Sequence, residues 1–247
     1  MALYVLITGF GPPHWEHKLQ ILENNLQKIT NHPWTTCDIH LCQYASPRDY
    51  EIPQSLQDKY RLTIHYAPGI VGEFILKHAH PDTLTQYDYV LILLDDIELQ
   101  NFHIPTLLKY IHQFNLDLIS PSLTQDSKYQ YDYLLSTNYT FHLKITNVCE
   151  YFCLLFKRES FSKYYNAILP ENPWMWGLDL ILYKHLKLNV GIANQILMKH
   201  WYKNDSYASR TDFNPAEGFH KQIKIYNETP DSLAMQKAVR YFVVDCE

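Results

Sequence analysis

The sequence lacks any apolar run approaching the roughly 20 residues that a membrane-spanning helix requires. Residues 3–7 are apolar, but no basic segment precedes them and the run ends at Gly9, so they predict a first strand rather than a signal peptide. None of the five cysteines forms a Cys-x-x-Cys pair, and their number is odd. That pattern argues against a disulfide framework or a zinc site and is typical of a reducing compartment. We therefore expect a cytoplasmic protein without a membrane span.

Basic residues are few and scattered. Lys and Arg number 21 against 26 Asp and Glu, which gives a formal net charge of -5. Without a basic stripe to follow a phosphate backbone, binding to nucleic acid is disfavoured. Repeats, low-complexity segments and Pro- or Ser-rich linkers are also absent, so nothing divides the 247 residues into separate domains. Apolar residues make up 47% of the chain, which is enough for a sizeable core.

Predicted strands and helices alternate along the chain, an order that favours an α/β fold with a parallel sheet. Apolar residues at spacings of three and four predict helices over residues 19–29, 70–78, 104–114 and 179–188. Short apolar or alternating runs predict strands over residues 3–8, 38–45, 61–65, 89–94, 116–120, 147–156 and 191–200.

The predicted strand at 89–94 ends abruptly in acid, with the sequence Asp95-Asp96-Ile97-Glu98. Open α/β sheets bind their ligands at the carboxyl ends of the strands. Crowded carboxylates repel one another unless a cation offsets their charge, and Mg²⁺ or Mn²⁺ suits such oxygen ligands and also binds substrate phosphates. The motif therefore predicts a nucleotide-diphosphate site. The alternative is a solvated turn or a helix N-cap, where Asp is also common.

A second motif stands downstream, Trp174-Met175-Trp176-Gly177-Leu178-Asp179, and a later apolar strand ends in Lys199-His200. With the acidic motif before them, in this order, these residues resemble GT-A-fold glycosyltransferases, and among them the small glycosyltransferases of large algal (chlorella-type) viruses. The resemblance extends over residues 3–202. It implies one GT-A-like domain, 1–247, with a mixed central sheet flanked by helices. A Rossmann-like nucleotide-binding half (1–100) would precede an acceptor half (101–203) and an irregular C-terminal tail (204–247).

The resemblance also implies a metal site, because the acidic motif of this family holds Mn²⁺ or Mg²⁺ against the donor diphosphate. The last Asp of the motif corresponds to Asp96, and His200 matches a histidine that completes the metal shell. Leu94 departs from the usual Asp-Asp-Asp form. If the frame is instead Asp96-Ile97-Glu98, Glu98 joins the ligands, since alternate residues of an extended chain share a side. A lone His after an apolar strand also has a structural reading.

Donor contacts are implied at the ends of the first strands, and we expect them at Thr8, Gly9, Gly69, Gly72 and Asp95. Asp179 matches the family's catalytic acid residue, here a base that takes the proton of the acceptor hydroxyl in an inverting transfer. The alternative role of Asp179 is to cap the following helix. Acceptor contacts are expected from residues whose side chains stack on or hydrogen-bond to a sugar: Trp174, Trp176 and Glu150. Glu150 has a second reading as a strand-edge residue.

Together these residues predict a metal-dependent glycosyltransferase that moves a sugar from a nucleotide-diphosphate sugar, with a UDP-sugar favoured, to a saccharide acceptor in glycan biosynthesis. If the protein is viral, it would act in the host cytoplasm. A sugar nucleotidyltransferase is one alternative, although Gly9-Phe10-Gly11-Pro12-Pro13-His14 has no nearby arginine to grip a triphosphate. The other alternative is an inactive carbohydrate-binding or scaffolding protein, in which Leu94 marks decay of the site.

Overall fold

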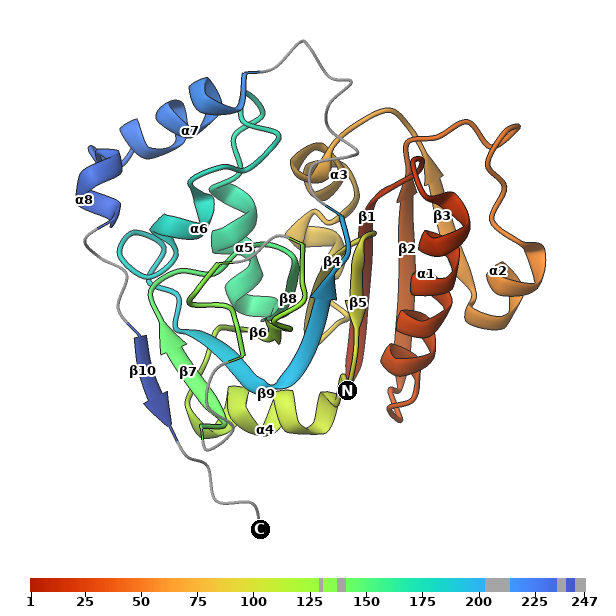
Figure 1. Ribbon diagram of the computed structural model, residues 1–247, viewed down its shortest axis with the longest axis horizontal. Helices are drawn as coiled ribbons and strands as arrows, with labels where there is room; N and C mark the ends of the chain where they lie inside the picture. Colours follow the sequence, from red (N-terminus) through yellow and green to blue (C-terminus); the bar gives the residue numbers. More distant parts are fainter. Residues whose placement is uncertain (129–130, 137–140, 203–213, 235–238, 243–247) are drawn as a thin grey trace.

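The computed structural model describes residues 1–128, 131–136, 141–202, 214–234 and 239–242 (Figure 1). Its N-terminal part forms the parallel strands of the sheet, which are β1 (Ala2–Phe10), β2 (Thr36–Gln43), β3 (Leu62–Tyr66) and β4 (Tyr89–Leu94). They lie in the order β3-β2-β1-β4, so β1 is flanked by a parallel strand on each side. This arrangement confirms the Rossmann-like half predicted from the alternating pattern.

The sheet continues from β4 in mixed orientation through β8 (Cys153–Lys157), β6 (Leu118–Leu123), β9 (Val190–His200), β7 (Leu143–Thr146) and β10 (Val239–Phe242). β8 is antiparallel to both β4 and β6, whereas β6 and β9 are parallel. The eleven-residue strand β9 also pairs, near its end, with the short strand β5 (Ile97–Leu99). As a result, β9 belongs to the C-terminal half and yet reaches the segment that follows β4.

Helices flank this sheet, and Figure 1 shows α1 and α2 beside the strands of the N-terminal half and α7 and α8 beside the C-terminal half. Their bounds are α1 (Trp15–Thr30), α2 (Gln54–Tyr60), α3 (Val71–His78), α4 (Ile104–Gln113), α5 (Arg158–Asn166), α6 (Leu178–Ile181), α7 (Pro215–Lys224) and α8 (Pro230–Ala234), with a 3₁₀ turn η1 (Pro81–Leu84). No helix among the described residues combines the length and apolar content needed to cross a membrane.

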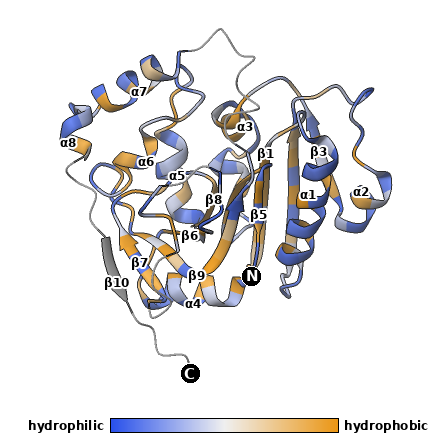
Figure 2. Ribbon diagram, viewed as in Figure 1, coloured by the Kyte–Doolittle hydropathy of each residue, from blue (hydrophilic) through white to orange (hydrophobic). Residues whose placement is uncertain are grey.

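The core lies on both faces of the central strands. All nine residues of β1 and all six of β4 are buried, and Figure 2 shows β1 and β9 coloured largely as hydrophobic. Strands covered on both faces are apolar throughout, which is why these segments read as unbroken runs in the sequence. Thr8 pairs with Leu94 in the register of β1 and β4. The polar residues that end these two strands therefore meet at the same carboxyl edge.

Two predicted elements are shorter than their apolar patterns suggested. The strand expected over 147–156 begins only at Cys153, because the pairing with β4 reaches only to the end of that strand: Leu93 stands opposite Cys153, and the Leu94 N–H donates to the Phe152 carbonyl (3.0 Å). The helix expected over 179–188 is limited to α6. Beyond α6, the N–H groups of His185 and Leu186 both donate to the Ile181 carbonyl, so the helical hydrogen-bond ladder stops advancing.

The C-terminal tail differs from the irregular segment predicted from residue 204. Where the structure describes it, the tail forms α7 and α8, and β10 pairs antiparallel with β7. The first of these helices packs closely on the segment before α6: a Cβ atom at Gly218 would lie 2.4 Å from Asn172 Oδ1, and one at Gly177 would lie 2.9 Å from the Phe219 ring. Such close approach needs residues without a side chain, a requirement that apolar periodicity cannot reveal.

Candidate active site

The acidic motif forms the turn between β4 and β5, and this turn is fixed from two sides. The Asp95 N–H donates to the Thr8 carbonyl of β1 (3.2 Å). On the other side, the segment ending at Phe152 accepts the Leu94 N–H described above. The two carboxylates of the turn therefore project from a backbone that is held in place, at the carboxyl edge of the sheet where α/β folds bind their ligands.

Asp95 lies in a buried ion pair with Lys18 of α1. Lys18 Nζ is 2.6 Å from Asp95 Oδ2, and the two side chains are 3% and 6% exposed. Lys18 Nζ also donates to the Gly11 carbonyl (2.9 Å). Burial raises the pKa of the Asp95 carboxyl to about 7, against the opposing effect of the Lys18 charge. Asp95 is therefore no part of a solvated turn, which excludes the simplest alternative for this half of the motif.

Asp96 points in another direction and meets His200. Asp96 Oδ2 lies 3.0 Å from His200 Nε2, and the Trp201 N–H donates to the Asp96 carbonyl (3.1 Å). The pairing of β5 with β9 brings them together, because Ile97 stands opposite His200 in that register. The ring of Phe152 covers the imidazole at a centroid distance of 4.6 Å. The structure thus joins two of the predicted metal ligands across 104 residues of sequence.

This pair fits a metal ion. Asp96 Oδ2 and His200 Nε2 are hydrogen-bonded at 3.0 Å, and two neighbouring ligand atoms on an octahedral ion, each about 2.1 Å from it, have the same separation of about 3.0 Å. A carboxylate and an imidazole are also ligands that Mn²⁺ accepts. Two protein ligands leave the other coordination positions for substrate oxygens and water, as is usual for metals that hold phosphates.

Glu98 does not join this pair. It stands in β5 opposite Lys199, one position along from the Ile97–His200 pair, so its side chain projects from the other face of the ladder. Its Oε2 accepts hydrogen bonds from Trp201 Nε1 (2.8 Å) and Gln100 Nε2 (2.9 Å). Among the residues described, no three or more His, Cys, Asp or Glu side chains are grouped so that they could hold a metal ion.

The second motif forms a tight turn into α6. Met175 and Gly177 both have positive φ (57° and 86°), and Gly177 occupies the N-cap position of α6. Asp179 therefore lies in the first turn of the helix. It is not the N-cap residue, so the alternative role of capping this helix is excluded. Trp176 is 44% exposed and offers an open ring face, whereas Trp174 is only 6% exposed and is part of the packing.

Asp179 and Glu150 lie in a common electrostatic environment. The pKa of the buried Tyr133 phenol is raised well above its ordinary value, first by burial and then by the charges of Glu150 and Asp179. The Cys149 N–H donates to the Asp179 carbonyl (3.4 Å). Phe152, three residues after Cys149, contacts His200, so the segment 149–152 touches both the backbone of Asp179 and the Asp96–His200 pair.

The predicted donor residues are divided between site and packing. Gly9 has φ 80°, and a Cβ atom there would lie 3.6 Å from Asp95 Oδ1, so this glycine borders the acidic turn. Thr8 is fully buried, and its Oγ1 has no hydrogen-bond partner among the residues that the structure describes. Gly72 donates its N–H to the Pro173 carbonyl (2.9 Å). A Cβ atom at Gly69 would lie 3.1 Å from the ring of Phe74, so both of these glycines serve close packing.

Two polar residues of α1 were not predicted to belong to the site. Lys18 holds Asp95, and Asn25, two turns later, donates to the Ile97 carbonyl (2.7 Å) and accepts the Leu99 N–H (2.8 Å). Both are buried and lie on the face that packs on the sheet. The sequence did contain a signal for them, because both residues occupy positions on the apolar face of the helix. A polar group buried there requires a partner.

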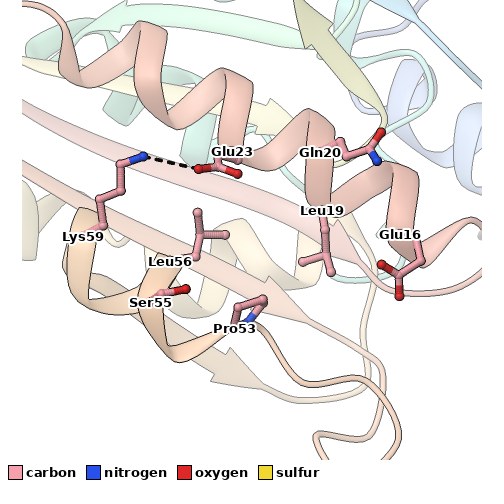
Figure 3. A pocket seen from close by; sticks show the side chains of 8 residues that line it. All are labelled: Glu16, Leu19, Gln20, Glu23, Pro53, Ser55, Leu56 and Lys59. Carbon is pink, nitrogen blue, oxygen red and sulfur yellow. Dashed lines mark hydrogen bonds and ion pairs between the residues drawn. The ribbon is translucent and has the colours of Figure 1, made fainter.

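A depression of about 360 Å³ lies between α1 and α2 and holds none of the predicted site residues (Figure 3). It is lined by Glu16, Leu19, Gln20, Glu23, Pro53, Ser55, Leu56 and Lys59. Glu23 and Lys59 form an exposed ion pair across it (3.2 Å). This depression therefore lies apart from the residues predicted to form the site.

No family model and no curated protein sequence matches the chain. Among solved structures, GalNAc-T7 with UDP, GalNAc and Mn²⁺ is 9% identical over 91% of this chain and 48% of that chain, with a TM-score of 0.66. S. aureus TarS is 9% identical over 92% of this chain and 43% of that chain, with a TM-score of 0.55. A structure of TarS 1-349 is 13% identical over 92% and 72%, with a TM-score of 0.51.

The chain therefore spans less than half of the first two structures. At such identities the likeness establishes the fold. The chain is structurally similar to GT-A glycosyltransferases, and its mixed α/β domain is GT-A-like, which confirms the fold class expected from the sequence.

Proposed function

We propose that the protein is a glycosyltransferase that uses a nucleotide-diphosphate sugar, with a UDP-sugar favoured, and a saccharide acceptor. The observation that carries the proposal is the Asp96–His200 pair at the carboxyl edge of a GT-A-like sheet. The similar fold of GalNAc-T7, whose structure contains UDP, GalNAc and Mn²⁺, supports this choice of donor. The resemblance to small glycosyltransferases of large algal viruses suggests a role in glycan biosynthesis.

Asp96 and His200 would hold the metal ion. We favour Mn²⁺ over Mg²⁺ because an imidazole nitrogen is a better ligand for Mn²⁺. When bound, such an ion stabilises the negative charge that develops on the departing nucleoside diphosphate. The ring of Phe152 against His200 keeps the imidazole facing the carboxylate, and the backbone bond from Trp201 to Asp96 fixes the other partner.

Asp179 is the proposed base of an inverting transfer. Its carboxylate takes the proton of the acceptor hydroxyl as that oxygen attacks the anomeric carbon. Its place in the first turn of α6, directly after the exposed ring of Trp176, suits an acceptor sugar stacked on that ring. Glu150, whose charge reaches the same tyrosine as that of Asp179, is the proposed hydrogen-bond partner of the acceptor.

The proposal is tested by measuring hydrolysis and transfer with a panel of UDP-, GDP- and TDP-sugars in Mn²⁺, for the wild type and for Asp96→Ala. We expect slow donor hydrolysis by the wild type and loss of Mn²⁺-dependent nucleotide binding in the variant. Asp126→Ala is a matched control. It also removes a carboxylate, but Asp126 is exposed and pairs with Lys199, the residue next to His200 in β9, so the variant should keep Mn²⁺-dependent nucleotide binding.

Three results would contradict the proposal. Turnover only with a nucleoside triphosphate would indicate a sugar nucleotidyltransferase. Carbohydrate binding without nucleotide binding would indicate an inactive binding protein. Unchanged nucleotide affinity in Asp96→Ala, with and without EDTA, would remove the acidic motif from the metal site.

A further inference from the structure

Helix α1 fastens the acidic turn through polar side chains on its buried face. Lys18 reaches Asp95, Asn25 bonds to both ends of β5, and Lys28 donates to the Leu99 carbonyl. Asn25 and Lys28 bond to backbone atoms, so their contribution depends on geometry alone. Lys18 differs from them because it is only 2% exposed and places its charge on a motif carboxylate.

The two aspartates of the acidic motif are adjacent in sequence, yet each has a different basic partner. Asp95 is directed toward α1 and the loop after β1, where its Oδ1 faces Gly9. Asp96 is directed toward β9 and His200. Without Lys18, no basic group would hold the buried Asp95 carboxyl against the loop after β1, and a buried polar side chain that loses its partner does not keep its position.

We propose that Lys18 is a positioning residue of the donor site, which holds the Asp95 side chain against the loop after β1. Asp95 then keeps its orientation toward Gly9, and Asp96 is the aspartate of the turn that faces the proposed metal site. This inference rests on the proposed function. It assigns to an α1 residue a role that the acidic motif itself does not contain.

The test measures the affinity for UDP with Mn²⁺ by calorimetry, and Mn²⁺ binding alone by electron paramagnetic resonance. The variants are Lys18→Met, Asp95→Asn and the double variant Lys18→Met/Asp95→Asn. We expect Lys18→Met to weaken UDP binding at least about tenfold, because the Asp95 side chain loses the partner that fixes its position. The double variant removes both charges, and its affinity should equal that of Asp95→Asn within about twofold.

Each outcome bears on the inference. Wild-type affinity in Lys18→Met, with only a lower melting temperature, would make Lys18 a structural clamp and overturn it. A double variant that binds UDP much more weakly than Asp95→Asn would also overturn it, because Lys18 would then contact the donor directly. Should Lys18→Met fail to fold, the comparison of the double variant with Asp95→Asn still decides. If the wild type itself binds no nucleotide, the proposed function fails first.

Discussion

Replacing His200 by alanine separates a metal ligand from a core histidine. His200 is one of the two side chains expected to hold the ion, so we expect His200→Ala to weaken Mn²⁺ binding about tenfold or more. The side chain is also buried against Phe152 and paired with Asp96, so the variant should lose about 1–3 kcal/mol of stability even without metal. The informative quantity is therefore the additional stability that Mn²⁺ confers on each protein.

That increment follows from mass action. At a Mn²⁺ concentration 100 times its dissociation constant, the wild type gains about 2.7 kcal/mol, and a tenfold weaker variant gains about 1.4 kcal/mol at the same concentration. For a domain of this size, 1 kcal/mol corresponds to about 2–4 °C, so the Mn²⁺ shift in melting temperature should fall from about 5–11 °C to about 3–6 °C.

The assay is thermal unfolding of each protein with Mn²⁺ and with EDTA. His185→Ala is the matched control, because His185 Nε2 lies 2.7 Å from Glu228 Oε1 in a second histidine–carboxylate pair far along the chain from the acidic turn. This control should lower the melting temperature and keep the full Mn²⁺ shift. If His200→Ala also kept the full shift, His200 would be a core histidine and the metal site would have to be sought elsewhere.

The other predictions concern catalysis, packing and pH. Asp179→Asn should bind donor and Mn²⁺ normally but transfer about 10²- to 10⁴-fold more slowly, as measured in steady-state assays; normal turnover would exclude it as the base. Gly72→Ala should lower the melting temperature, because its Cβ atom would lie 2.7 Å from the Pro173 carbonyl oxygen, whereas an unchanged value would show that the loop moves easily. Burial, the neighbouring His65 and the Lys77 charge lower the pKa of His78 to about 4, so the folded protein favours the neutral ring. Because the unfolded histidine has the ordinary pKa of about 6.5, unfolding takes up a proton below that pH, and the stability should fall as the pH drops from 6.5 toward 4. In a series of denaturation measurements across this range, His78→Gln should show a weaker dependence of stability on pH. An unchanged slope would assign the pH dependence to other groups.

The sequence predicted those helices and strands whose buried residues recur at a regular spacing or form an unbroken apolar run. β1, β4 and the apolar face of α1 are recognisable because burial on one or both sides leaves a local pattern. The pattern reports that a residue is buried and says nothing of its partner. For that reason residues 147–152 were expected to be strand, although residues 148–152 are buried outside any strand. β5, with three residues, is too short to leave any periodic signal.

The same limit applies to the candidate site. Asp96 was recognisable from its position after a buried strand, and its pairing with His200 was expected only through family resemblance. Local spacing could not supply the pair, because a register between β5 and β9 creates it. Lys18 was missed for a related reason: its partner is 77 residues away, and a lysine near the start of a helix ordinarily faces solvent.

The pairing of β5 with β9 also sets the order in which the site can form during synthesis. Asp96 precedes His200 by 104 residues, so the acidic turn leaves the ribosome roughly 5–20 s before its partner at ordinary rates of translation. The parallel strands β3-β2-β1-β4, with α1 and the Lys18–Asp95 pair, are complete well before that moment. If Asp96 and His200 hold a metal ion as proposed, nascent chains arrested before β9 emerges should contain the N-terminal strands without affinity for Mn²⁺, and should acquire that affinity only when β9 docks.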